Sequence, residues 1–233
     1  MSIGIFLLAT PAVGFSAAGQ SESTDRVASD TSAVIRARFE NIASYTVTER
    51  YAVYRNGAPA AAAERTVRAK YEKSNGASYE TVSQSGSSML QSLAIEPAIG
   101  SDKRINDPAL RNQLMLTTDN YEFHVEPART LIGAQDCFVI DVKARKASAY
   151  LINGKAWVDA KTYLLVRVQG TQSKSSSLWA GTPFITRDFA NLNGFAMVIH
   201  EKIEAHNFLL GQTVEEIDYN DYTVTGSAKP VVR

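Results

Sequence analysis

The stretch LINGKAWVDAKTYLLVRVQG, residues 151–170, has the two-residue period of a β-hairpin. One face of its second half carries three aliphatic residues, which are Leu164, Val166 and Val168. The other face mixes polar and apolar residues, which are Arg167, Gln169, Tyr163 and Leu165. A strand with apolar surface on both faces is covered by two layers, or one of its faces lines a hollow.

The hairpin belongs to a long series of strand-like segments separated by turn signals such as NGAP and NG. The alternating segments are 44–55, 64–73, 77–84, 120–127, 135–144, 148–160, 162–170, 184–192, 195–208 and 213–224. Short turns join most of them, so consecutive strands are expected to be antiparallel and in up-and-down order. The pattern predicts about ten strands in a long antiparallel sheet that is strongly curved or closed.

Two segments have a helical pattern instead. From residue 24 to residue 44 the apolar positions recur at spacings of three, four and seven, which predicts a helix ahead of the sheet. Residues 86–118 interrupt the strands with an apolar insertion, in which Asp107 and Pro108 have the signature of a helix start. An insertion of this kind is either a lid or part of the core. The fold class is therefore α+β, a strongly curved antiparallel sheet with an N-terminal helix and a helical lid insertion.

The composition is that of one globular domain. The chain has 233 residues, of which 45% are hydrophobic and 21% are charged. Lys and Arg together number 24, as do Asp and Glu, so no basic excess indicates nucleic acid as a partner. The single cysteine, Cys137, has no partner for an internal disulfide or a metal site, and we expect a small buried residue there.

The N-terminal segment predicts export. Residues 3–18 are apolar and end in small residues, as in a signal peptide that spans residues 1–19. An N-terminal anchor or a buried strand is the alternative. No cysteine follows that would carry a lipid, so we expect a soluble, non-lipidated protein in the periplasm. A single domain at residues 24–225 and a flexible tail at residues 226–233 would remain after cleavage.

No linear motif indicates catalysis, and we expect neither an enzyme nor a bound cofactor or metal. The sequence lacks G-x-S-x-G, H-E-x-x-H, a P-loop and C-x-x-C. His200 and His206 share a strand face but lie roughly 20 Å apart at a strand's rise, too far for one metal ion. The acidic pair Glu215–Glu216 is read as part of a solvated strand face. An enzyme would instead require a cluster of polar residues with perturbed pKa values inside the fold.

The large apolar residues are the candidates for ligand contacts, because they are spread over several strands and the insertion. Each of them is either core or cavity lining. The candidate ligand-binding residues are Met89, Leu93, Ile95, Trp157, Leu165, Trp179, Phe184 and Phe195.

The C-terminal half resembles a known family. INGKAWVDAKTYLLVRVQG, residues 152–170, is similar to the G-x-x-W-V-D…V-R-x-E-G segment of the periplasmic outer-membrane lipoprotein-sorting (LolA/LolB-like) superfamily. The family follows this segment with aromatic-rich strands, which here are PFITRDFANLNGFAMVI, residues 183–199, and YNDYTV, residues 219–224. The motifs cover about residues 140–225, and the order of elements covers the rest.

The resemblance implies a half-open β-barrel whose helices form a lid over an apolar cavity. It also implies a periplasmic carrier whose partners are a lipid or an acylated lipoprotein, with transient contact to a membrane surface. No cavity arginine of the carriers matches a position here, and the chain lacks the N-terminal cysteine of the lipid-anchored branch, which favours a relative with a different cargo. The alternative is an envelope sensor or scaffold that uses the same fold to bind a protein partner.

Overall fold

The computed structural model describes residues 17–175, 182–207 and 211–227. Most of the expected signal peptide at residues 1–19 and of the tail at residues 226–233 lies outside these ranges. The helical elements are α1 (Ala17–Asn41), α2 (Ser88–Leu90), the π-helical turn η1 (Gln91–Ile95), α3 (Glu96–Ile105) and α4 (Arg111–Leu114). The strands are β1 (Ile42–Arg55), β2 (Ala63–Glu72), β3 (Gly76–Gly86), β4 (Tyr121–Val125), β5 (Thr130–Ile132), β6 (Gln135–Ala144), β7 (Ile152–Asp159), β8 (Leu165–Gln172), β9 (Phe184–Leu192), β10 (Phe195–Asn207) and β11 (Gly211–Gly226).

All described strand pairs are antiparallel, and they form one sheet in the order β3-β2-β1-β11-β10-β9-β8-β7-β6-β4, with β5 beside β6. The predicted α+β class and long antiparallel sheet are confirmed. The predicted up-and-down order holds within each half of the chain, but β1 pairs with the last strand, β11, rather than with an edge. As a result β3 and β4, which are neighbours in the sequence, are the two edges of an open sheet.

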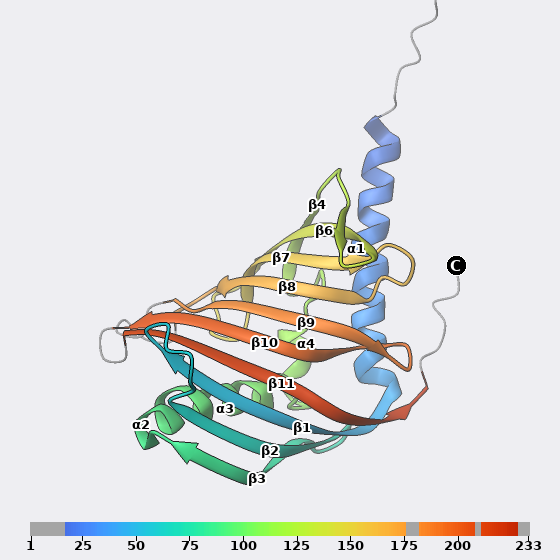
Figure 1. The fold of residues 1–233 in the computed structure, drawn as a ribbon. Coiled ribbons are helices and arrows are strands. Elements are labelled where there is room, and N and C mark those ends of the chain that lie inside the picture. Colours follow the sequence, from blue (N-terminus) through green and yellow to red (C-terminus); the bar gives the residue numbers. More distant parts are fainter. Residues whose placement is uncertain (1–16, 176–181, 208–210, 228–233) are drawn as a thin grey trace, which may run out of the picture.

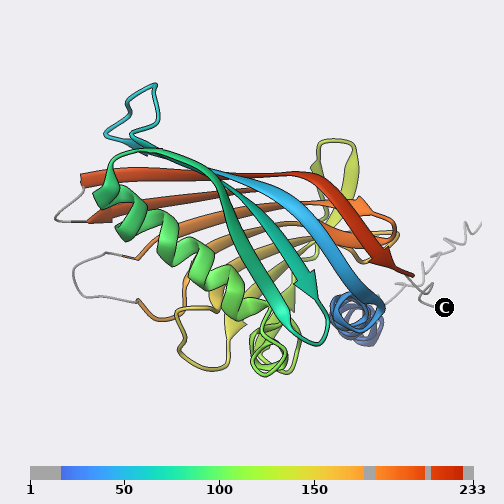
Figure 2. The same ribbon diagram turned by 90° about the horizontal axis from the view of Figure 1, so that it is seen from below.

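The helices cover one side of this curved sheet (Figure 1). The chain leaves the sheet at the β3 edge and rejoins it at the β4 edge, so the insertion between them crosses the open side. Figure 2 shows α3 lying across that side, with α1 farther along the same concave side. A space therefore lies between the concave face of the sheet and the helices that cover it.

The insertion is one continuous helical stretch over residues 88–105. Ser87 caps its start by accepting a hydrogen bond from the Leu90 backbone N–H at 3.4 Å. Pro97, in the first turn of α3, has no N–H to donate, which coincides with the wider π-helical turn just before it. The helix predicted to start at Pro108 is displaced: Asp107 accepts a hydrogen bond from Ala109 N in a turn, and α4 begins only at Arg111.

The core is divided between the two ends of the sheet. Strands β1, β2, β10 and β11 pack together with Leu90 and Ile95 of the insertion. Strands β4, β6, β7 and β8 form a second cluster around Val27 of α1. Only a small group, Val34 with Leu164 and Ala196, lies between them. The middle of the concave face is therefore less completely filled than its ends.

Candidate functional site

A cavity of about 480 Å³ occupies the middle of the concave face. Small-molecule sites in proteins are commonly about 300–1,000 Å³ and predominantly apolar. We call it the larger cavity. It is lined by α1, by α3 and the segment around α4, and by strands β1, β4 and β7 to β11. Its apolar wall includes Val34, Phe39, Leu116, Leu165, Val168 and Phe195.

The β7–β8 hairpin contributes residues to this wall that a regular alternation of side chains would place on opposite faces. Trp157 pairs with Arg167 and Val158 pairs with Leu165, so Val166 is an extra residue in β8. A bulge of one residue reverses the alternation of side chains along a strand. For this reason Leu165 and Val168, which a regular strand would place on opposite faces, both line the larger cavity.

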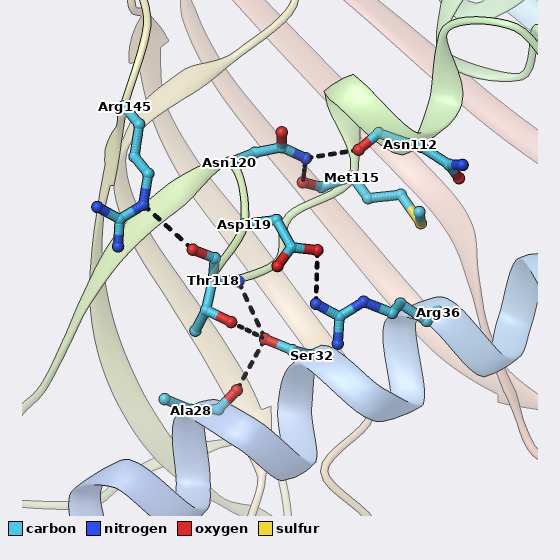
Figure 3. Close-up of polar contacts among 9 residues, drawn as sticks. All are labelled: Ala28, Ser32, Arg36, Asn112, Met115, Thr118, Asp119, Asn120 and Arg145. Carbon is cyan, nitrogen blue, oxygen red and sulfur yellow. Dashed lines mark hydrogen bonds and ion pairs between the residues drawn. The ribbon is translucent and has the colours of Figure 1, made fainter.

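Polar contacts hold α1 against the segment that follows α4 (Figure 3). Ser32 Oγ accepts a hydrogen bond from the Thr118 backbone N–H at 3.1 Å, and its hydroxyl donates to the Ala28 carbonyl at 2.8 Å. One helical turn along, the Arg36 guanidinium donates to the Asp119 carboxylate at 2.6 Å. These contacts fix α1 next to Leu116 and so define one side of the larger cavity.

The segment after α4 is itself braced by a side chain. The Asn120 amide nitrogen donates to the carbonyls of Asn112 and Met115, each at 2.9 Å (Figure 3). Arg145 Nε donates to the Thr118 carbonyl at 3.1 Å. Because these bonds end on backbone carbonyls, the loop that receives α1 keeps a defined shape without regular secondary structure.

A buried ion cluster connects α3 to the sheet. Arg187 of β9 lies 2.7 Å from the Glu201 carboxylate of β10 and 3.9 Å from the Asp102 carboxylate of α3. Tyr219 of β11 donates its hydroxyl to Asp102 at 3.3 Å, and Glu201 lies 3.5 Å from the same oxygen. Burial raises the pKa of both carboxyl groups, and the Arg187 charge opposes that rise.

Two further carboxyl groups are buried on the same side of the sheet. The Tyr51 hydroxyl donates a hydrogen bond to the Glu49 carboxylate. Burial raises the pKa of Glu49 to about 8. Burial, with the Glu201 charge next in importance, raises the pKa of Glu215 to about 8. Raised carboxyl pKa values occur in catalytic sites, binding sites and structural ion networks alike. The raised pKa values therefore identify a desolvated cluster of carboxyl groups and do not specify a reaction.

A second cavity, of about 210 Å³, lies between α3 and strands β1 and β8 to β11. This smaller cavity has apolar side chains such as Leu93, Ile203 and Ile217, together with the polar side chains of Gln172 and Glu215. The two cavities are adjacent because five residues line both of them, namely Asp102, Ile105, Tyr150, Ile152 and Arg187. The ion cluster therefore sits where the cavities meet.

The residues expected to contact a ligand are only partly brought together. Leu165 and Phe195 line the larger cavity, and Leu93 lines the smaller one. The others line neither cavity: Ile95 is fully buried in the core, Trp157 is half-buried on β7, and Met89 and Phe184 are 46% and 41% exposed. Trp179 lies outside the described residues.

Sequence reasoning missed the charged residues of the interior. The expected solvated face is wrong for Glu215, which is only 5% exposed. A signal was present, because Glu215 has the parity of the apolar residues Ile217 and Tyr219 along β11. In the same way Glu49 lies between Val47 and Tyr51 on the inward face of β1. A charged residue at an apolar position of a strand is thus the feature to look for.

This chain has a hollow α+β fold. An N-terminal helix and a helical insertion cover the concave face of its open antiparallel sheet. The fold is similar to that in the crystal structure of an outer-membrane lipoprotein-sorting protein domain from Vibrio parahaemolyticus. That domain has 15% sequence identity and a TM-score of 0.50, over 88% of this chain and 93% of its own. The chain therefore has the outer-membrane lipoprotein-sorting (LolA-like) fold, and the expected resemblance is confirmed as a likeness of fold.

Two other solved structures are more distant. A LolA-superfamily protein from Nitrosomonas europaea has 13% identity and a TM-score of 0.44, over 87% of this chain and 93% of its own. A DUF1329 family protein from Desulfovibrio piger has 13% identity and a TM-score of 0.42, over 85% and 92% of the two chains. No protein-family model and no curated protein matches the sequence. In the described ranges, no helix has both the length and the apolar character needed to cross a membrane.

Proposed function

We propose that this protein is a carrier that binds a lipid, or the acyl chain of a lipoprotein, in the larger cavity. The observation that supports this function is the hollow of about 480 Å³ between the concave sheet, α1 and the insertion. Its aliphatic and aromatic wall suits hydrocarbon. Leu165 and Phe195 would contact the chain, and Leu93 would contact whatever enters the smaller cavity.

The hydrophobic effect provides enough free energy for such a role. Burial contributes about 0.8 kcal/mol for each CH₂ group, or roughly 10 kcal/mol for a chain of about twelve. Loss of motion by the chain and by the protein removes much of this. The remaining free energy suits a carrier, which has to hold its cargo in transit and then release it.

The insertion has the properties of a lid. None of the residues of α3 is fully buried, although Ala98 and Ile99 pack against the core. Arg65 of β2 donates to Gln91 of η1 at 2.9 Å and pairs with Glu96 of α3. The Glu96 side chain is 56% exposed, so water can replace this ion pair at little net cost. We therefore assign the access route of the ligand to the edge of the sheet under α3.

The proposed setting is the periplasm. A signal peptide at residues 1–19 would direct export, residues 24–225 would form the lipid-binding domain, and residues 226–233 would be a tail. A carrier of this kind exchanges its cargo with a membrane surface or with another envelope protein. Its proposed partners are therefore a lipid or an acylated lipoprotein.

Native mass spectrometry of the full-length protein tests the proposal. The protein is exported to a bacterial periplasm and purified without detergent, and its bound material is then extracted and identified. We expect a co-purified phospholipid, fatty acid or acylated peptide in stoichiometric amount. A protein that carries no lipid and that also ignores added lipid would contradict the carrier function.

An envelope sensor or scaffold is the second candidate, and the β3 edge supports it. Strand β3 pairs on one side only, and most of its residues are exposed. Val82 on this strand and Met89 just after it are 57% and 46% exposed. An exposed strand edge beside apolar side chains is suited to the addition of a strand from a partner. A lipid-free protein that retains a specific envelope partner would favour this function.

A further inference from the structure

The wall of the smaller cavity contains hydrogen-bond acceptors that nothing in the described structure satisfies. Glu215 Oε1 and Gln172 Oε1 are both buried, and neither has a hydrogen-bond partner among the described residues. Both side chains line the smaller cavity, from β11 and β8 respectively. Buried polar atoms are usually hydrogen-bonded, so two unpartnered acceptors at one cavity indicate a missing donor.

The neighbouring charges do not supply that donor. Three other charged residues line the smaller cavity, which are Glu201 on β10, Arg187 on β9 and Asp102 on α3. Arg187 is held by Glu201 at 2.7 Å and lies 3.9 Å from Asp102. No described Lys or Arg forms a salt bridge with Glu215. With the Glu215 carboxyl group ionised, three carboxyl groups and one guanidinium give the smaller cavity a negative balance, which favours a cation.

The Thr213 hydroxyl, which also lines the smaller cavity, already has a hydrogen-bond partner. Thr213, which precedes Glu215 on the same face of β11, donates its hydroxyl to the Ala205 carbonyl at 3.4 Å. In the larger cavity the unpartnered buried group is instead a donor, the Nε of Arg38. Among the described residues, the larger cavity therefore has an unpaired donor and the smaller cavity has unpaired acceptors. A ligand with N–H groups fits the smaller cavity.

We propose that the smaller cavity binds the ammonium end of a cationic amphiphile, whose hydrocarbon chain lies in the adjacent larger cavity. An ammonium group supplies up to three N–H donors and a positive charge, which match the Glu215 carboxylate and the Gln172 carbonyl. The inference rests on the proposed carrier function, because the larger cavity has to accept the chain. The inference adds the chemistry of the polar end of the cargo, which the fold alone does not determine.

Three ligands that share a twelve-carbon chain and differ in their polar end separate the contribution of that end to binding from the contribution of the chain. Dodecylamine, dodecanol and dodecanoate are titrated into the full-length protein, purified free of lipid, at pH 7. We expect dodecylamine to bind at least about tenfold more tightly than dodecanol, as for a charge-assisted hydrogen bond in a buried site. Butylamine has the same ammonium group without the chain and should bind far more weakly than dodecylamine.

The variant Glu215→Gln keeps the shape of the side chain and removes its charge. We expect it to weaken dodecylamine binding about tenfold and to leave dodecanol and dodecanoate binding unchanged. The matched control is Glu216→Gln, the next residue of β11, which lies on the opposite face and lines neither cavity. This control should bind all three ligands as the wild type does.

Proton release provides a readout that a merely structural role of Glu215 would not affect. Because the pKa of Glu215 is raised to about 8, the group is mostly protonated at pH 7 in the empty cavity. An ammonium ligand that binds the carboxylate would expel up to about one proton. Calorimetry in two buffers of different ionisation enthalpy measures this release, which should disappear in Glu215→Gln.

The possible outcomes separate the inference from the carrier function. If none of the three twelve-carbon ligands binds, the carrier function itself is contradicted. If dodecanol binds but dodecylamine gains nothing over it, or if Glu215→Gln affects all ligands equally, the carrier function stands and the inference is wrong. Binding of butylamine as tightly as dodecylamine would show a site for free amines, which also overturns the inference.

Discussion

The larger and the smaller cavity share one sheet and one helical insertion but differ in their walls. The larger cavity lies against α1 and is bordered mainly by aliphatic and aromatic side chains such as Val34 and Phe195, and the buried carboxyl group of Glu49 also lines it. The smaller cavity lies under α3 and includes the buried carboxyl group of Glu215. The difference suits the proposed ligand, which has a hydrocarbon chain and a polar end. Substitutions on the two walls test the comparison.

The largest expected effect concerns Arg187, which borders both cavities. Arg187→Leu should lower the free energy of unfolding by about 3–5 kcal/mol, because it leaves the buried Glu201 carboxylate without its partner at 2.7 Å. Urea denaturation at pH 7 measures the change. The matched control is Arg167→Leu, which breaks the more accessible pair with Asp188 and should cost about 1 kcal/mol. Equal losses in the two variants would mean that the interior cluster is as well hydrated as the outer pair.

The next effect concerns the contribution of Glu215 to the pH dependence of stability. Its carboxyl pKa is raised from 4.5 to about 8 on folding, so the folded state retains a proton that the unfolded state has lost between these values. Stability should therefore fall as the pH rises from about 4.5 to about 8, by up to about 1.4 kcal/mol per pH unit for this group. Glu215→Gln should flatten the curve in that window.

Denaturation midpoints at half-unit pH intervals test the prediction. Glu49, whose pKa is also raised to about 8, remains in the variant, so part of the slope should persist. Glu216→Gln should leave the whole curve unchanged. An identical slope in the wild type and in Glu215→Gln would mean that the Glu215 carboxyl group is not desolvated.

The smallest effect concerns the attachment of α1, which borders only the larger cavity. Ser32→Ala removes the acceptor of the Thr118 N–H and should cost about 1 kcal/mol of stability. Arg36→Ala breaks an accessible ion pair with Asp119 and should cost less, about 0.5 kcal/mol. Thermal unfolding of the two variants gives the order. A larger loss in Arg36→Ala would show that the ion pair, and not the buried hydroxyl, secures the helix.

The strands of this fold are readable from the sequence because each is long and alternates regularly. The segments predicted at 135–144 and 184–192 coincide with β6 and β9. The helix predicted over residues 24–44 overlaps α1, which packs through Val27 and Val34 but ends at Asn41. What the pattern does not contain is the pairing of β1 with β11. That pairing joins residues far apart in the chain, and short-range periodicity carries no information about it.

The site was less predictable than the fold. Leu165 was expected to contact a ligand and lines the larger cavity, but only because the bulge opposite Trp157 turns it inward. Apolar residues such as Ile95 serve the core equally well, so residue type alone does not separate lining from packing. Glu215 was missed because it was grouped with its half-buried neighbour Glu216 on a solvated face, although it has the parity of the inward residues of β11.

The most direct test of the account is to fill the larger cavity and measure binding. Val198 of β10 lines this cavity, whereas the next residue, Ile199, is 40% exposed and lines neither cavity. Dodecanol binding is measured by calorimetry for the wild type, Val198→Trp and Ile199→Trp, with thermal unfolding as a check that each variant is folded. We predict at least about tenfold weaker binding in Val198→Trp and unchanged binding in Ile199→Trp. Equal affinity in all three proteins would contradict the claim that the larger cavity holds the hydrocarbon chain.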